Sequence, residues 1–319
     1  MVGFFYYLTS SNYARLNLKF VKNKIMSNVG LIIEERAADL GNFLVGRLLP
    51  FRQKRAVGPF VFIDHMGPTK LKDYQNLDVG PHPHIGLSTL TYLFEGSIQH
   101  KDSLGNDLEI KPGAVNWMTG GRGVVHSERT PEYLRTTDKS IHGLQIWIAL
   151  PKELEEIEPN FTHVAAEDIP TWSEDGITYK LIAGKFKNYE SPVPVYSPLY
   201  YIEIKTTQDV KVKLGDGLFG ESALYVLEGE VKDEGNSYGP KQLLVAKDAT
   251  LCELEVKANS TIYIFGGDAF PEERFIYWNF VSSSKERIEQ AKEDWINHRF
   301  PKVPGDDDYV PMPDYTKKK

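Results

Sequence analysis

The sequence predicts an all-β protein built from two tandem β-barrels, with one short helix near the C-terminus. Three observations indicate this fold. Short runs of β-branched and aromatic residues recur along both halves of the chain, separated by glycine- and proline-containing turn signals. No segment before Pro151 has a sustained helical period. The length of 319 residues is typical of about two domains.

In the first half, five segments have the composition of strands: 57–68, 87–98, 114–121, 123–128 and 142–151. We expect the first strand to end at the turn signal Gly67-Pro68. Further turns are expected at 103–106 and at Pro112-Gly113. This order of strands and tight turns predicts a first barrel.

An acidic, proline-bounded stretch, 152–170, is interpreted as the connection between the two domains. Beyond it, seven segments again have strand composition: 177–186, 198–205, 210–215, 223–231, 242–247, 252–256 and 260–267. Their short, regular spacing with glycine turns predicts a second barrel or sandwich.

Residues 282–300 carry the helical pattern. Ser284 can cap this helix, because a serine side chain can accept a hydrogen bond from a free backbone N–H of the first turn. Four apolar residues fall near one face: Ile288, Ala291, Trp295 and Ile296. The proline-rich, charged tail that follows, 302–319, is expected to wrap the domain or to fray.

The composition excludes several classes of protein. A net charge of −7 argues against direct nucleic-acid binding. No run reaches the roughly 18 apolar residues of a membrane-spanning helix. The single cysteine, Cys252, allows no disulfide and no CxxC motif, and we interpret it as a small apolar strand residue. We therefore expect a cytoplasmic protein with no membrane or nucleic-acid partner.

Four residues in the first half predict a metal site. His82 and His84 form one pair, in PHPH, and His126 and Glu128 form another, in GRGVVHSE. Side chains two residues apart on a strand point to the same face, so each pair presents two ligands together. If the two strands face one another inside the barrel, three imidazoles and a carboxylate converge. This donor set suits one divalent first-row metal ion and leaves coordination positions open.

The other histidines stand singly: His65, His100, His142, His163 and His298. His100 either orients a ligand imidazole through a hydrogen bond or is a loop residue near a turn, and we give the two interpretations equal weight. His142 is interpreted as a barrel residue with its own hydrogen-bond partner.

Three further residues lie near the second pair in the sequence. Trp117 and Met118 could line the pocket mouth, although such residues on a strand are usually core. Arg122 could steer an anionic substrate. Its segment GGRG lacks the strand and helix context of a nucleotide loop, and we interpret it as the tight turn that directs His126.

The domain assignment follows from these patterns. We assign 28–155 to the N-terminal metal-binding domain, 156–285 to a C-terminal domain without metal, and 286–319 to the helix and tail. The remaining segment, 1–27, is a basic leader without acidic residues, either disordered or absent from the protein. Its basic residues follow the apolar run, unlike those of a secretory signal. A transit peptide fits weakly, and we favour a start assigned too early, with Met26 as the natural first residue.

Several motifs closely resemble the pirin family of the cupin superfamily. They are FIDHMGP, GPHPHIGLSTLTYLFEGSIQHKDSLGN and IKPGAVNWMTGGRGVVHSE, with FGGDAFPEERFIYWNFVSS and FPKVPGDD near the C-terminus. The likeness runs from about Asn28 to about Pro313. It implies a bicupin of two jelly-roll barrels, with one mononuclear metal, usually Fe(II), in the first. Cu, Mn, Ni, Co and Zn are the alternatives.

The resemblance places the metal ligands at His82, His84, His126 and Glu128. Two features depart from the wider cupin pattern. Thr89 stands near the position of the usual first-motif glutamate, and no histidine follows Gly113 in the second motif. The resemblance implies that the HSE segment supplies the replacements, which is the pirin variation of the pattern.

The resemblance also implies a function, namely a quercetin 2,3-dioxygenase that opens flavonols with O₂ and releases carbon monoxide. Three neutral imidazoles, one carboxylate and a divalent ion leave a charge of +1, which favours an anionic oxygen ligand. Glu128 is then either a permanent ligand or a ligand that leaves the metal and takes the substrate proton as a general base. The alternatives are a non-enzymatic metal- or redox-responsive regulatory protein that binds transcription factors or metabolic enzymes, and an enzyme on an unidentified small molecule. We expect a monomer.

Overall fold

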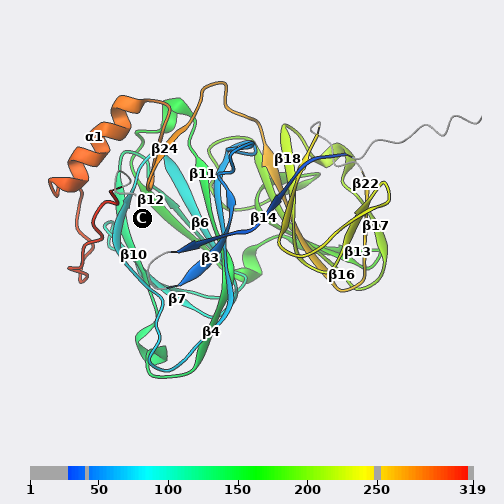
Figure 1. The fold of residues 1–319 in the computed structure, drawn as a ribbon, viewed down its shortest axis with the longest axis horizontal. Helices are drawn as coiled ribbons and strands as arrows, with labels where there is room; N and C mark the ends of the chain where they lie inside the picture. The colour runs from blue at the N-terminus through cyan, green and yellow to red at the C-terminus, as the bar shows by residue number, and fades with distance from the viewer. Residues whose placement is uncertain (1–27, 40–42, 248–252, 315–319) are drawn as a thin grey trace, which may run out of the picture.

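The computed structural model describes residues 28–39, 43–247 and 253–314. The predicted leader, 1–27, and Cys252 lie outside these ranges. The predicted all-β fold of two barrels with one short α-helix is confirmed (Figure 1). In the described part of the chain, no helix is long and apolar enough to cross a membrane.

Two antiparallel sheets form the first domain (Figure 1). The larger has the order β12-β9-β6-β11-β4-β3-β2, and the smaller has the order β5-β10-β7-β8. The strands are β2 (Arg36–Asp39), β3 (Leu44–Leu49), β4 (Phe60–Leu71), β5 (Asp78–His84), β6 (Leu87–Glu95), β7 (Ile98–Asp102), β8 (Asp107–Ile110), β9 (Val115–Thr119), β10 (Val124–Arg129), β11 (Lys139–Ala149) and β12 (Asn160–Val164).

The second domain repeats this arrangement. Its larger sheet has the order β1-β21-β18-β23-β16-β14-β13, with β15 paired to β14, and its smaller sheet has the order β17-β22-β19-β20. The strands are β1 (Val29–Glu34), β13 (Thr171–Glu174), β14 (Ile177–Phe186), β15 (Tyr189–Glu190), β16 (Leu199–Thr206), β17 (Val210–Lys213), β18 (Glu221–Glu228), β19 (Val231–Asp233), β20 (Asn236–Tyr238), β21 (Gln242–Ala246), β22 (Glu253–Val256) and β23 (Ser260–Gly267).

The remaining elements are short. Strands β24 (Phe275–Tyr277) and β25 (Phe280–Ser282) form a separate pair, followed by α1 (Lys285–Ile296). Four single turns of 3₁₀ helix are η1 (Glu132–Leu134), η2 (Lys152–Leu154), η3 (Ala166–Asp168) and η4 (Gly215–Gly217).

The two larger sheets pack against each other, and their alternating side chains explain this contact. Leu90 and Tyr92 of β6 join Tyr201 and Tyr263 of the second domain in one apolar cluster. The rings of Tyr92 and Tyr263 lie 6.3 Å apart in an edge-to-face arrangement. Because successive strand residues point to opposite faces, Thr91 must point into the first barrel. One face of each large sheet therefore builds the domain interface, and the other lines a barrel.

Two predictions about the first domain are wrong, one on the end of a strand and one on the connection that follows the barrel. Strand β4 does not end at Gly67-Pro68 but continues to Leu71, and its pairing with β11 shifts register at this point. The irregular register accommodates Pro68, which cannot donate a ladder hydrogen bond. The stretch 152–170 is also more than a connection, because β12 within it pairs with β9 at the edge of the first domain.

The chain crosses between the domains more often than the sequence indicated. Strand β1 pairs with β21 of the second domain, whereas β2 pairs with β3 of the first. The chain also returns at its C-terminal end, since β25 contacts β5 and β6 of the first domain. The boundaries at 155 and 285 stay predictions.

The predicted helix and its cap are confirmed. The Ser284 side chain accepts a hydrogen bond from the backbone N–H of Arg287 at 3.2 Å. Ile288, Ala291 and Trp295 are buried, but Ile296 is 55% exposed, so its predicted place on the apolar face is wrong. As the last residue of the helix, Ile296 lies beyond the surface that the other three cover.

The described part of the tail wraps the first domain. The backbone N–H of Val310 donates to the carbonyl of Pro81 in β5, at 3.2 Å. The Arg129 guanidinium in β10 donates to Asp306 and Asp308, with distances of 2.7 Å. The tail therefore lies against the two strands that carry the predicted metal ligands.

A buried ion pair holds the returning C-terminal strands, and removing its acid should destabilise the fold. Glu155 and Arg274 are both buried, with Arg274 Nε 3.3 Å from Glu155 Oε1. Glu155 also accepts hydrogen bonds from Ser282 and Ser283. Glu155→Ala leaves the buried Arg274 with one longer carboxylate contact, to the exposed Glu272 at 3.5 Å, so we expect a loss of up to about 3–5 kcal/mol in unfolding free energy.

Chemical denaturation measures this loss, with Glu153→Ala as the control. Glu153 is an exposed neighbour in the same 3₁₀ turn, and its removal should change stability by about 0.5 kcal/mol or less. Equal stabilities of the two variants would contradict the assigned role of Glu155.

Candidate metal centre

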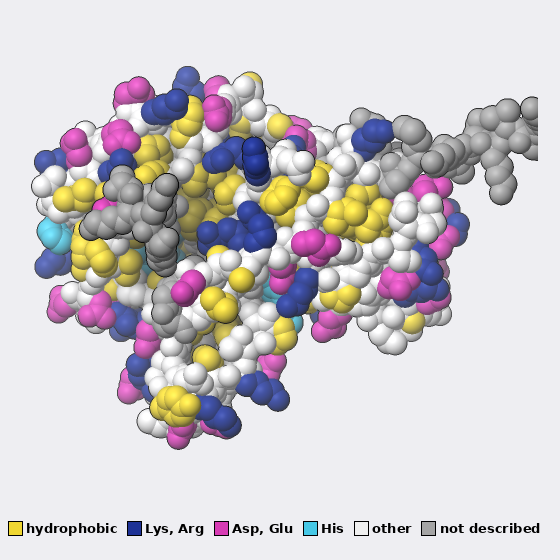
Figure 2. Space-filling model, viewed as in Figure 1, with side chains coloured by type: hydrophobic (Ala, Val, Ile, Leu, Met, Phe, Trp, Pro, Cys, Tyr) yellow, Lys and Arg dark blue, Asp and Glu magenta, His cyan; other side chains and the backbone are white. Residues whose placement is uncertain are grey.

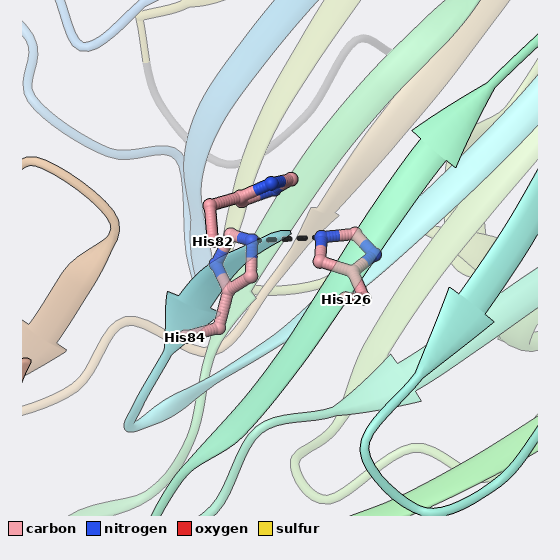
Figure 3. A group of neighbouring side chains, drawn as sticks. All are labelled: His82, His84 and His126. Atoms are coloured by element: carbon pink, nitrogen blue, oxygen red, sulfur yellow. Dashed lines mark hydrogen bonds between the residues drawn. The ribbon is translucent and has the colours of Figure 1, made fainter. Parts of the chain in front are cut away.

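Two neighbouring strands of the smaller sheet supply three imidazoles. His82 and His84 lie on β5, His126 lies on β10, and His126 is the register partner of His82. One ring nitrogen from each lies within 4.8 Å of the others. Figure 3 shows the three rings gathered at one point. The predicted convergence of these histidines is confirmed, but the two strands are hydrogen-bonded neighbours and do not face each other across the barrel.

The ring nitrogens available to a metal are identified by their partners. His82 Nδ1 lies 2.8 Å from the carbonyl oxygen of Gly80, to which it donates, so its Nε2 carries the lone pair. His84 Nε2 and His126 Nε2 lie 3.1 Å apart (Figure 3). Three Nε2 atoms can therefore bind one ion.

Burial keeps these imidazoles neutral. His82, His84 and His126 are 7%, 1% and 1% exposed. Burial lowers the pKa of His82 to about 4, and it lowers the pKa values of His84 and His126 well below the ordinary range. Neutral imidazole is the form that binds metal ions. The donor set therefore fits a divalent first-row transition metal.

Glu128 lies on the same strand as His126, two residues further along, but it has another partner in the structure. The three mutually close ligand atoms found among the described residues do not include its carboxylate. The Thr91 hydroxyl has one proton and two possible acceptors. Glu128 Oε1 lies at 3.3 Å and Gln145 Oε1 lies at 2.9 Å. Burial raises the pKa of Glu128, while His100 and Thr91 act in the opposite direction. Its role as a fourth ligand stays a prediction.

His100 contacts Nδ1 of His126, the ring nitrogen that is not assigned to the metal. It is a buried residue of β7, so its interpretation as a loop residue is wrong. Its Nδ1 lies 3.4 Å from His126 Nδ1, and its Nε2 lies 3.1 Å from Asp102 Oδ2. If His100 donates from Nε2 to Asp102, its Nδ1 can accept from His126, which leaves His126 Nε2 for the metal. The hydrogen-bonding interpretation fits this geometry.

Two residues around the site were missed in the sequence. Asp102 is fully buried and accepts hydrogen bonds from the backbone N–H groups of Leu104 and Asn106. Its position two residues after His100 is the signal that could have found it. The ring of Trp147 lies edge-on to His84 with centroids 5.3 Å apart, and only its place on a predicted strand indicated burial.

The remaining candidates have structural roles. Trp117 belongs to the apolar cluster between the domains, and Met118 is also buried. Arg122 is exposed and forms an ion pair with Glu158. The GGRG turn is confirmed, because the N–H of Gly123 donates to the carbonyl of Gly120 directly before β10 begins. His142 lies outside the metal centre and pairs with His65.

Comparison with known proteins agrees with this architecture. The Pirin family model matches residues 42–148, and the Pirin C-terminal cupin domain matches residues 201–301. A pirin-like protein of Caulobacter vibrioides is 45% identical over 291 residues, covering 90% of this chain and 100% of that protein. Human pirin is 30% identical over 223 residues, covering 68% of this chain and 75% of that protein.

A solved structure is also similar. The quercetin 2,3-dioxygenase of Acinetobacter baumannii is 33% identical and superposes with a TM-score of 0.80, covering 90% of this chain and 97% of that one. Together, these matches confirm the resemblance found in the sequence and the bicupin fold.

His100 should matter for metal affinity although it need not contact the ion. His100→Phe keeps a ring against Phe161, on which His100 stacks at 4.7 Å, but removes the partner of His126 Nδ1. We expect affinity for Ni²⁺ or Fe²⁺ to fall by about 10–100-fold. Isothermal titration of chelator-treated protein measures it, with the exposed His163→Ala as the control. Unchanged affinity in His100→Phe would refute the orienting role.

Proposed function

The chain belongs to the pirin family, and we propose that it is a metal-dependent dioxygenase that opens flavonol-like substrates with O₂. The observation that carries this proposal is the group of three buried imidazoles. The similarity to a quercetin 2,3-dioxygenase from Acinetobacter baumannii supports the choice of substrate. We propose Fe(II) as the metal, bound by His82, His84 and His126, with Glu128 as the fourth ligand.

The ligand charges favour a chelating substrate. Once bound, the metal would supply Lewis acidity and redox chemistry. With three neutral imidazoles and one carboxylate around a divalent ion, the centre keeps a charge of +1. A deprotonated 3-hydroxyl beside the 4-keto oxygen of a flavonol offers the matching anionic oxygen. The buried surroundings strengthen this attraction, because few water molecules screen it.

Glu128 is the residue we propose as the proton acceptor. Burial raises its pKa, and a carboxylate with a raised pKa is a stronger base at neutral pH. Thr91, on the opposite sheet, can donate to its Oε1 at 3.3 Å, and Gln145 Oε1 is the alternative acceptor for the same hydroxyl. Glu128 would take the 3-hydroxyl proton of the substrate at one carboxylate oxygen.

The proposal is tested by aerobic incubation of Fe(II)-loaded protein with quercetin. Loss of the flavonol absorbance together with release of carbon monoxide is the expected result. If the protein gives no turnover with Fe, Mn, Co, Ni, Cu or Zn, the proposal is wrong. The regulatory function implied by the resemblance then becomes the better hypothesis, and protein partners become the subject of the search.

Replacing the proposed base should affect rate more than metal content. Glu128→Gln keeps three imidazoles, so it should retain metal, while the loss of a general base typically lowers the rate by about 10²–10⁴-fold. His126→Ala should act mainly through lower occupancy. Turnover per bound metal, measured after elemental analysis, separates these effects, with the exposed Glu132→Gln as the control. A parental rate in fully loaded Glu128→Gln would exclude Glu128 as the base.

Substrate preference should follow the chelating group. A flavonol with a 3-hydroxyl should be turned over, whereas the matching flavone without it should be neither bound at the metal nor cleaved. Competition of the flavone against quercetin in the same assay measures this difference. Equal inhibition and turnover of the two compounds would contradict binding through the 3-oxygen.

A further inference from the structure

A second pair of histidines lies on the first domain, outside the metal centre. His65 of β4 and His142 of β11 stand on adjacent strands, and their Nε2 atoms are 2.8 Å apart. The Nε2 atoms of His84 and His126 in the proposed metal centre are 3.1 Å apart. The two pairs therefore have similar geometry, although nothing in the proposed reaction uses His65 or His142.

A carboxylate holds the other side of His65. Glu35 Oε1 lies 2.5 Å from His65 Nδ1, and Tyr225 of the second domain lies 2.9 Å from the same nitrogen and donates to Glu35. Lys241 Nζ lies 3.6 Å from the second carboxylate oxygen. With Nδ1–H donating to Glu35, His65 presents the lone pair of Nε2 to His142. In many metal sites a histidine donates one ring N–H to a carboxylate and binds the metal through its other ring nitrogen.

The backbone aims His142 at this point. The register of β11 shifts beside His142 against both neighbours, between Ile141 and Gly143 on the β4 side and between His142 and Gly143 on the β6 side. Such irregularities redirect side chains and occur beside functional sites. Burial and then the charge of His65 lower the pKa of His142 to about 4, so its ring is neutral at pH 7 and can offer a lone pair.

We propose that His65 and His142 form a second, weaker site for a divalent transition-metal ion, with Glu35 as the carboxylate that orients His65. Two nitrogens bound tetrahedrally at about 2.0–2.1 Å lie roughly 3.3 Å apart, so the pair needs to open by about half an ångström. The carboxylates of Glu95 and Glu35 act on His142 with negative charge, and Lys241 acts in the opposite direction.

A surface hollow lies beside His65, one of the two proposed ligands. This hollow of about 450 Å³ is lined by His65, Glu35 and Lys241, among other residues. His142 is half-buried, whereas His65 is 2% exposed. On the face that Figure 2 shows, basic and acidic side chains lie interspersed, with some histidine surface among them. With only two protein ligands, water would complete the coordination of the ion. We therefore expect this site to bind metal more weakly than the site with three imidazoles. Zn²⁺ and Cu²⁺ are the ions that nitrogen ligands favour.

Equilibrium dialysis of the full chain against Zn²⁺ tests the proposal, after resident metal has been removed with a chelator. We expect two equivalents of Zn²⁺, one tight and one weak. His142→Ala and His142→Phe should lose the weak equivalent and keep the tight one, and the Phe variant keeps a ring against Phe94. His82→Ala should weaken the tight equivalent and keep the weak one. The exposed His163→Ala is the control and should bind both.

Glu35→Gln gives an independent readout. It should weaken the second equivalent by about 10–100-fold without changing the first. The proposal is overturned if the parent binds one equivalent only, in which case the two rings share only a hydrogen bond. It is equally overturned if both His142 variants still bind two equivalents of Zn²⁺ while thermal denaturation shows that they are folded. Both results are independent of whether the protein turns over quercetin.

Discussion

The packing of the two large sheets against each other is the constraint on which the metal centre depends. Tyr92 and Ile146 belong to the apolar cluster that joins the domains. The residues that alternate with them, Thr91 and Gln145, consequently point into the first barrel, where Thr91 contacts both Gln145 and Glu128. A shift of one residue in either strand would place polar groups between the domains and apolar groups at the site. The interface therefore fixes the register on which the site geometry rests.

The second barrel shows what the same architecture becomes without a ligand set. Ile202, Ile204 and Ile264 alternate with residues of the interface and fill that barrel with an apolar cluster. The sequence contains no histidine between His163 and His298, so this barrel has no imidazole to offer. Its larger sheet instead supplies the apolar face that the first domain needs. A barrel filled in this way has a structural role.

The period of the strands explains how much could be predicted from the sequence. Spacing by two residues selected His82, His84 and His126, because alternation is a local property of the chain. The pairing of β5 with β10 and the contact of Glu35 with His65 are not local, since these residues are 30 or more positions apart. Glu35 is brought to His65 because the chain passes from the second domain to the first between β1 and β2. No pattern of neighbouring residues predicts that the chain passes from one domain to the other at this point.

Burial has opposite effects on the two kinds of ligand, and together these effects favour chemistry at the centre. Removing water from an imidazole disfavours its cation, so the pKa values of the three histidines fall and each ring keeps one nitrogen free of a proton at neutral pH. Removing water from a carboxylate disfavours its anion, so the pKa of Glu128 rises. Binding a cation beside Glu128 would compensate that cost, because the anion then has a partner. The same desolvated space thus prepares three neutral ligands for a metal ion and makes the neighbouring carboxylate a stronger acceptor for a proton.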